Sequence, residues 1–152
     1  MMDRLREVGG GSQVMQMWDM LLFNVLSGNT DAHLKNHSLL LSSEGVKLAP
    51  IYDVMCAGVW PNITRNLAFD VGGKRVGDYI EGRHWRREAE ACGLAPRRAL
   101  TRVEDMSNKV RNELRATAED VAAMPAGYHG ILEGVMEEVD RRCKTVLSTL
   151  AK

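Results

Sequence analysis

The chain has 152 residues, 45% of them hydrophobic and 26% charged, which suits one globular domain that buries a core. Twenty basic residues balance twenty acidic ones and aromatic residues make up only 5%, so neither charge nor stacking capacity indicates a nucleic-acid-binding surface. Three distant cysteines without a C-x-x-C pair favour reduced thiols over a disulfide or a zinc site.

The N-terminal residues 1–12 are predicted to form a flexible lead-in, because a charged stretch runs into Gly9, Gly10, Gly11 and Ser12. This stretch lacks the apolar run of a signal peptide. Nowhere does an apolar run approach the roughly 18 residues that a membrane span needs. We therefore expect a cytoplasmic protein with no membrane partner, whose folded domain covers residues 13–152.

A buried helix followed by a hairpin is predicted next. Apolar residues at three- and four-residue steps indicate a helix over residues 12–27, and the wide apolar face indicates burial on most sides. Gly28 follows the last periodic residue and suits the left-handed conformation that ends a helix. Residues 38–41 and 46–49 are strand candidates, and the Ser-Ser-Glu-Gly sequence between them predicts a β-hairpin.

The remainder of the chain is predicted to be a helical lobe. Residues 55–80 are irregular apart from one short strand candidate, and Gly93 and Pro96 mark a helix end and a helix start. The strand is expected at 67–71, and helices at 82–92, 96–124 and 131–150. The fold class is therefore mainly α (α+β), with a small β-hairpin at one edge.

Three oxygen-bearing side chains are arranged in an order that suits phosphoryl transfer. Asp31 and Asn36 lie in the loop after the buried helix, and the hairpin then returns the chain to Asp53. A D-x-x-x-x-N loop, two short strands and a second Asp form the layout of a protein-kinase catalytic loop and metal-binding segment. Asp31 would accept the proton of a substrate hydroxyl, and Asn36 and Asp53 would offer magnesium hard oxygen ligands. Lys35 would add positive charge against the transferring phosphoryl group.

Structural roles remain alternatives for each of these residues when only the spacing is considered. Asp31 and Asn36 also suit a helix cap or a turn, and Asp53 a surface turn beside a proline. His33 is equally compatible with a structural role that ties the loop to the lobe. The other three histidines show no metal-ligand spacing.

The exact sequence around these residues favours the catalytic roles over the structural ones. Residues 23–38, F-N-V-L-S-G-N-T-D-A-H-L-K-N-H-S, with residues 48–54, L-A-P-I-Y-D-V, closely resemble the HipA-like serine/threonine kinases, which are toxins of bacterial toxin–antitoxin systems. In that family N-x-D-x-H-x-K-N is the catalytic loop, and Y-D-[IV] takes the place of the kinase DFG motif. The resemblance implies these roles: catalytic for Asp31, His33 and Lys35, and binding of Mg²⁺, and through it ATP, for Asn36 and Asp53.

The resemblance also implies a function and partners. It implies the helical C-lobe of a protein-kinase-like fold that transfers phosphate from ATP to a protein serine or threonine. The family phosphorylates glutamyl-tRNA synthetase and binds a helix-turn-helix antitoxin of the HipB type. Contact with DNA would then be indirect, through the antitoxin.

The nucleotide-gripping half of a kinase has no counterpart in the sequence before residue 23. No Gly-rich phosphate loop follows a strand there, and no strand lysine is present. We therefore expect little activity from the chain alone, and an apolar patch on the helix over residues 12–27 and on the hairpin that binds a separate N-lobe or self-associates. The helix carries more apolar residues than one face needs, and part of the surface formed by Met15, Met17, Trp18, Met20 and Phe23 is expected to remain exposed. The alternatives are a non-catalytic truncated lobe that binds the antitoxin, and a remnant without a role.

Overall fold

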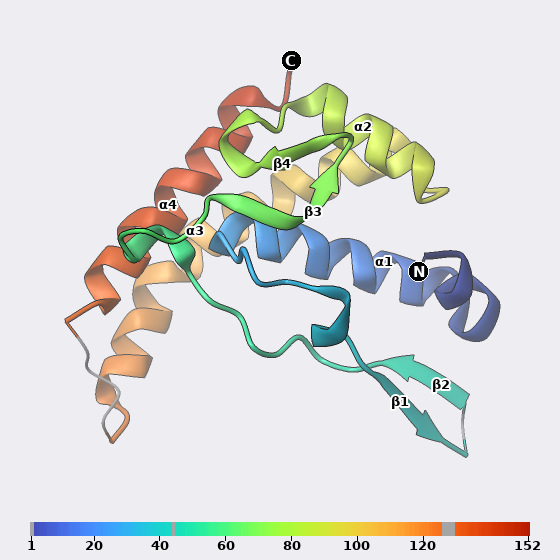
Figure 1. Cartoon of the computed structure of the whole chain (residues 1–152), viewed down its shortest axis with the longest axis horizontal. Coiled ribbons are helices and arrows are strands. Elements are labelled where there is room, and N and C mark those ends of the chain that lie inside the picture. Colours follow the sequence, from blue (N-terminus) through green and yellow to red (C-terminus); the bar gives the residue numbers. More distant parts are fainter. Residues whose placement is uncertain (1, 44, 126–129) are drawn as a thin grey trace.

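Helices dominate the part of the chain that the structure, a computed structural model, describes: residues 2–43, 45–125 and 130–152 (Figure 1). The helices are α1 (Met2–Ser27), α2 (Gly82–Ala91), α3 (Pro96–Ala123) and α4 (Leu132–Thr149). Two antiparallel hairpins are formed by β1 (Leu39–Ser42) with β2 (Gly45–Leu48), and by β3 (Asn66–Val71) with β4 (Lys74–Val76). Single 3₁₀ turns lie at η1 (Leu34–Asn36), η2 (Ala57–Val59) and η3 (Gly77–Tyr79).

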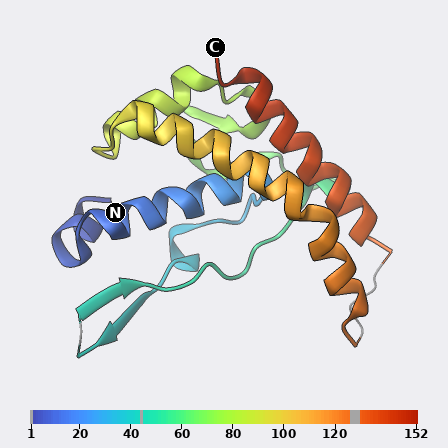
Figure 2. The ribbon, with the colours of Figure 1, turned by 180° about the vertical axis from the view of Figure 1, so that it is seen from behind.

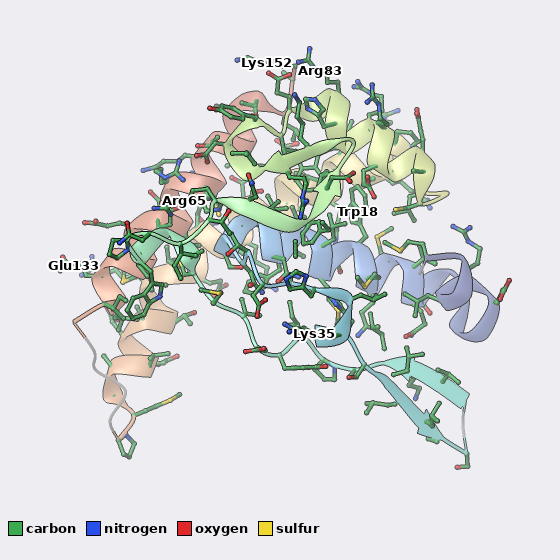
Figure 3. The ribbon with its side chains drawn as sticks, viewed as in Figure 1. Trp18, Lys35, Arg65, Arg83, Glu133 and Lys152 are labelled. Atoms are coloured by element: carbon green, nitrogen blue, oxygen red, sulfur yellow. The ribbon has the colours of Figure 1, made fainter. Side chains whose placement is uncertain are left out.

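The main core lies where α1 meets α2, α3, α4 and β3. Trp18 points from α1 toward α2 and packs edge to face against Trp85, with ring centroids 5.8 Å apart (Figure 3). Viewed from behind, α3 crosses α1 and α4 returns alongside α3 (Figure 2). The fully buried members of this core include Leu22, Leu26, Leu67, Val71, Ala89, Val103, Cys143 and Val146. The predicted mainly α fold with a small hairpin is confirmed.

The predicted lead-in is wrong for residues 2–12. These residues are helical and continuous with the buried helix, apart from a break at Gly10, where φ is 72° and ψ is −172°. Leu5 is buried in a second cluster with Val14, Met17 and the β2 residue Leu48. This tertiary contact supplies an anchor that the local sequence does not show, and a glycine permits the break at low steric cost.

The prediction of exposed apolar residues on α1 is wrong for Met17, Trp18 and Met20, whereas Met15 and Phe23 are half-buried. Met17, Trp18 and Met20 are 5%, 0% and 7% exposed, because β2, α2 and the N-terminal turns of α1 cover them. The hairpin does expose apolar residues, as predicted: Leu39, Leu40 and Leu41 of β1 are 48%, 54% and 79% exposed. Strand β2 packs against α1, and the turn end of the hairpin β1–β2 projects away from the helices (Figure 1).

The remaining elements follow the predicted order closely. Strand β3 covers the predicted residues, and Gly72 and Gly73 adopt positive φ in the turn that follows it. Strand β4 was not predicted, because three residues are too few for an alternating pattern. Between the predicted helices at 96–124 and 131–150, residues 126–129 fall outside the described residues. No helix in the described ranges is both long and apolar enough to cross a membrane.

The start of α2 carries a pH-sensitive contact. His84 is buried, and its Nδ1 accepts a hydrogen bond from the backbone N–H of Glu81 at 3.0 Å. Burial, together with the nearby charge of Arg83, holds the pKa of His84 below its ordinary value of 6.5. The unfolded chain therefore binds a proton at a higher pH than the folded chain does, and folding stability falls as pH drops below about 6.5.

We expect the His84→Gln variant to lose this part of the pH dependence, because glutamine does not titrate. The measurement is the free energy of unfolding in urea at pH 7.5 and at pH 5.5 for the parent and the variant. The control is His37→Gln, which makes the same substitution in the loop after α1. Equal slopes for the parent and His84→Gln would contradict the assignment.

Candidate active site

The loop that carries Asp31 begins at a well-defined helix end. Gly28 has φ 70°, and its N–H donates to the carbonyl of Val25 at 3.2 Å. The N–H of Asn29 donates to the carbonyl of Asn24 at 2.9 Å. These two bonds form the Schellman arrangement that ends a helix with a left-handed residue. The predicted role of Gly28 is confirmed, and the chain leaves α1 in a fixed direction. We call residues 28–38 the N-x-D loop.

A pair of buried amides holds the backbone of Asp31. Asn24 and Asn29 are 1% and 2% exposed, and Asn29 Nδ2 donates to Asn24 Oδ1 at 2.9 Å. Asn29 Oδ1 in turn accepts the backbone N–H of Asp31 at 3.0 Å. The Asp31 side chain itself is 46% exposed. The solvent-facing carboxylate of Asp31 is thus supported from below by a pair of buried, hydrogen-bonded amides.

Sequence reasoning missed the role of Asn24. The available signal was a polar residue inside the apolar stretch Leu21-Leu22-Phe23-Asn24-Val25-Leu26. A buried amide requires a partner, since an unpaired polar group in a core is costly. The partner, Asn29, lies across the helix end, so pairing depends on how that end is capped.

His33 and Asn36 gather around Asp31. His33 Nε2 lies 3.3 Å from Asp31 Oδ1, and the N–H of His33 donates to the Asp31 carbonyl. Asn36 Nδ2 donates to the same carbonyl at 2.8 Å. Lys35 lies on η1 with an exposed side chain, on the side of α1 from which the hairpin projects (Figure 3). The structure therefore joins Asp31, His33 and Asn36 by direct contacts.

Asp53 lies on a segment that runs back along the N-x-D loop. We call residues 49–57 the return segment. Hydrogen bonds join it to the loop before and after Asp53: Ala49 N to Ser38 O at 2.8 Å, Ser38 Oγ with Tyr52 OH at 2.7 Å, and Ala57 N to Gly28 O at 3.2 Å. These bonds place Asp53 opposite the loop, without a direct hydrogen bond to Asp31 or Asn36 among the described contacts.

The backbone of Asp53 is strained. Its φ is 55°, a left-handed conformation that among the described non-glycine residues only Asn62 shares. Such a conformation costs about 1–3 kcal/mol and persists where the surroundings impose it, often at functional sites. Its side chain is exposed to solvent. The sequence predicted the residue but not this conformation.

The side chains fit a hard divalent cation bound together with phosphate. Asn36 commits its Nδ2 to the Asp31 carbonyl, which leaves its amide oxygen as the atom that could face a cation. Asp53 offers an exposed carboxylate. In the described ranges no three His, Cys, Asp or Glu residues are grouped so that they could hold a metal by themselves. Magnesium bound through one or two protein oxygens, with phosphate oxygens and water completing the octahedron, does not need such a cage.

The cysteine thiols do not suit nucleophilic chemistry. Cys56, at the end of the return segment, borders a cavity of about 620 Å³ together with Val54 and Met55. Burial raises the pKa of the Cys56 thiol, and burial raises the pKa of Cys143 to about 11. Both thiols are therefore protonated near neutral pH, and the thiolate is the reactive form.

Comparison with known proteins shows which family this chain belongs to. A family model described as "HipA-like C-terminal domain" matches residues 1–114. The chain belongs to this family. The HipA-like assignment made from the N-x-D loop and the return segment is thus confirmed, although the match does not test the roles of individual residues.

Two relatives and one solved structure extend this comparison. The serine/threonine-protein kinase toxin HipA of Shewanella oneidensis is 27% identical over 122 residues, covering 80% of this chain and 27% of that protein. Y4mE of Sinorhizobium fredii, named as a kinase, is 29% identical over 112 residues, covering 71% of this chain and 27% of that protein. This HipA-like chain therefore spans about a quarter of the length of these relatives.

The solved structure shows that the fold is shared. In the complex of Shewanella oneidensis HipA with HipB and its operator DNA, the matching chain superposes with a TM-score of 0.78 at 18% identity. The match covers 89% of this chain and 32% of that chain. The helical lobe with its small hairpin is therefore a HipA-like C-terminal fold, as predicted.

Proposed function

We propose that this chain is the catalytic lobe of a HipA-like serine/threonine kinase toxin that transfers phosphate from ATP to a protein hydroxyl. The observation that carries the proposal is how Asp31 is held. Its carboxylate faces solvent while its backbone is bonded to Asn29 and Asn36, and the return segment brings Asp53 opposite. Phosphoryl transfer depends mainly on such positioning and on charge neutralisation.

Each side chain has a defined task in this reaction. Asp31 accepts the proton of the attacking serine or threonine hydroxyl, and His33, 3.3 Å from Asp31 Oδ1, orients that carboxylate. Lys35 places positive charge beside the transferred phosphoryl group. Asn36 and Asp53 would hold Mg²⁺ by their side-chain oxygens. When bound, the ion supplies charge neutralisation on the phosphate oxygens of ATP.

The hairpin is the proposed contact for the nucleotide-gripping N-lobe. Leu39, Leu40 and Leu41 are about half exposed or more, on a hairpin whose turn end projects away from the helices. A run of exposed apolar residues on an edge strand promotes aggregation unless another surface covers it. Because the chain spans 27% of its relatives' length, we assign the cover to the remainder of a HipA-like kinase rather than to a second copy.

The proposed macromolecular partners follow from the family. The antitoxin would be a helix-turn-helix protein of the HipB type, and DNA would be reached through it. The solved Shewanella oneidensis complex contains HipA, HipB and operator DNA, which supports this choice. Glutamyl-tRNA synthetase is the proposed substrate, on the family resemblance alone. A cytoplasmic location is part of the same proposal.

The test is reconstitution with a HipA-type N-lobe, fused or mixed with the chain. We expect negligible transfer of labelled phosphate from ATP by residues 1–152 alone and clear transfer after the N-lobe is added. Leu40→Asp, at a residue 54% exposed, should weaken reconstitution by mixing, whereas Met124→Asp, at an apolar residue of similar exposure (57%) at the end of α3, should not. Robust phosphorylation by the chain alone would contradict the need for an N-lobe. Antitoxin binding without phosphorylation in any combination would favour the non-catalytic interaction lobe.

A further inference from the structure

A buried arginine contacts the end of α1 that leads into the N-x-D loop. Arg142 on α4 is 7% exposed, and no other Lys, Arg, Asp or Glu whose side-chain burial the structure describes is as well covered. Its Nε donates to the carbonyl of Val25 at 2.8 Å, across 117 positions of sequence. The same carbonyl accepts the N–H of Gly28. A positive charge at a helix C-terminus is favourable, because the carbonyl ends there carry the negative end of the helix dipole.

Acidic partners balance the buried charge. Arg142 Nη1 lies 3.5 Å from Glu138 Oε1 and 3.9 Å from Asp78 Oδ1. Arg141, the preceding residue, contacts the same two carboxylates from the exposed side, at 2.8 Å to Glu138 and 3.1 Å to Asp78. Hydrogen bonding from Arg141, followed by the charges of Arg141, Arg142 and Arg65, holds the pKa of Glu138 below its ordinary value. Glu138 is therefore ionised at neutral pH and pairs with the buried guanidinium.

Three glycines leave room for this pair. A Cβ at Gly28 would lie 3.1 Å from Arg142 Nε, and a Cβ at Gly77 would collide with Arg142 Nη2. A Cβ at Gly58 would collide with the Glu138 side chain. Gly58 lies in η2, directly after the return segment. The pair thus packs against the start of the N-x-D loop through Arg142 and against the end of the return segment through Glu138.

The loop and the return segment meet at the same point. The N–H of Ala57 donates to the carbonyl of Gly28 at 3.2 Å, so the glycine on which Arg142 rests also holds the return segment. One residue further along the loop, Asn29 carries the bond to the Asp31 backbone. A shift of Arg142 would therefore move both sides of the candidate site.

We propose that Arg142 is a positioning residue, which sets the N-x-D loop against the return segment from helix α4. The inference rests on the proposed function for its catalytic consequence, but not for its structural one. Helix α4 lies beyond residues 1–114, which match the family model. Arginine suits the task because Nε and the two Nη atoms can bind different partners at once, whereas the single ammonium of lysine serves fewer directions.

The structural consequence is tested by amide hydrogen exchange on residues 1–152. In Arg142→Met we expect the N–H groups of Asn29, Asp31 and Ala57 to exchange about tenfold faster relative to those of α3, since the loss of one hydrogen bond from a charged donor has this order of effect. The matched control is Arg141→Met, which removes a neighbouring arginine with the same acidic partners but no contact to α1. It should leave these three amides unchanged.

The catalytic consequence is tested in the N-lobe-completed protein. Arg142→Met should lower kcat by about tenfold and leave KM for ATP within about twofold, because the reacting groups shift while the contacts that the N-lobe makes with the nucleotide stay. Arg142→Lys should recover part of the loss. If the completed parent shows no kinase activity, the proposed function fails and the exchange measurement still decides the positioning role.

Two results would overturn the inference. One is a uniform acceleration of exchange in α2, α3 and the loop, which would mean that Arg142 stabilises the fold without a particular effect on the site. The other is an equal effect of Arg141→Met. If Arg142→Met does not fold, Arg142→Lys decides between the same outcomes, with local acceleration expected and uniform or absent acceleration contradicting the proposal.

Discussion

Replacing Asp31 with Asn should lower kcat of the N-lobe-completed protein by about 10²–10⁴-fold, the usual contribution of a positioned general base. An amide cannot accept the proton of the substrate hydroxyl, although it matches the carboxylate in size. The bonds that seat residue 31, from its N–H to Asn29 Oδ1 and from Asn36 Nδ2 to its carbonyl, use backbone atoms and survive the substitution. The free energy of unfolding should therefore change little, while steady-state phosphorylation nearly disappears.

The control for this substitution is Asp120→Asn, at an exposed carboxylate on α3. It removes one negative charge from the lobe and should leave kcat unchanged. His33→Gln should have a smaller effect than Asp31→Asn, because His33 acts on the reacting atoms only through Asp31. An Asp31→Asn protein that kept more than about a tenth of the parental turnover would contradict the role of general base.

The second large effect is expected for Asp53→Asn. The substitution removes the negative charge proposed to hold Mg²⁺, and we expect kcat to fall by about 10²-fold or more, since ligand charges stabilise the transferring phosphoryl group through the ion. Asparagine is the appropriate replacement at φ 55°, because Asn adopts the left-handed conformation more readily than most residues. Fold stability should therefore be retained.

A metal titration distinguishes Asp53→Asn from Asp31→Asn. Weakened metal affinity should appear as a higher Mg²⁺ concentration at half-maximal activity, and as weaker Mn²⁺ binding measured by paramagnetic broadening. In Asp31→Asn the metal dependence should match that of the parent. Unchanged Mg²⁺ dependence in Asp53→Asn, with normal turnover, would remove Asp53 from the proposed metal site.

Local signals in the sequence determined most of the secondary structure and the order of the site residues. The apolar periodicity of residues 12–27, Gly28 at the helix end and Pro96 at a helix start act within a few residues. The structure is helical over 12–27, ends that helix at Ser27 and begins α3 at Pro96 as predicted, although α1 starts earlier, at Met2. The string over residues 23–54 likewise indicated the HipA family, which the family match confirmed. These features are local, because helix periodicity, capping and turn chemistry depend on near neighbours.

Tertiary structure alone decided which surfaces are covered and what holds the site in place. Leu5 anchors residues 2–12 as helix, and Trp85 covers Trp18, each through a contact with a residue distant in sequence. Arg142 reaches Val25 across 117 positions. Periodicity shows that a helix has an apolar face, but not which element will cover it, because burial depends on packing between segments that meet only in the folded chain. For the same reason, the sequence motif was enough to predict Asp31 and Asp53 as site residues. The residues that hold them in place, Asn24, Asn29 and those of α4, could be recognised only in the folded structure.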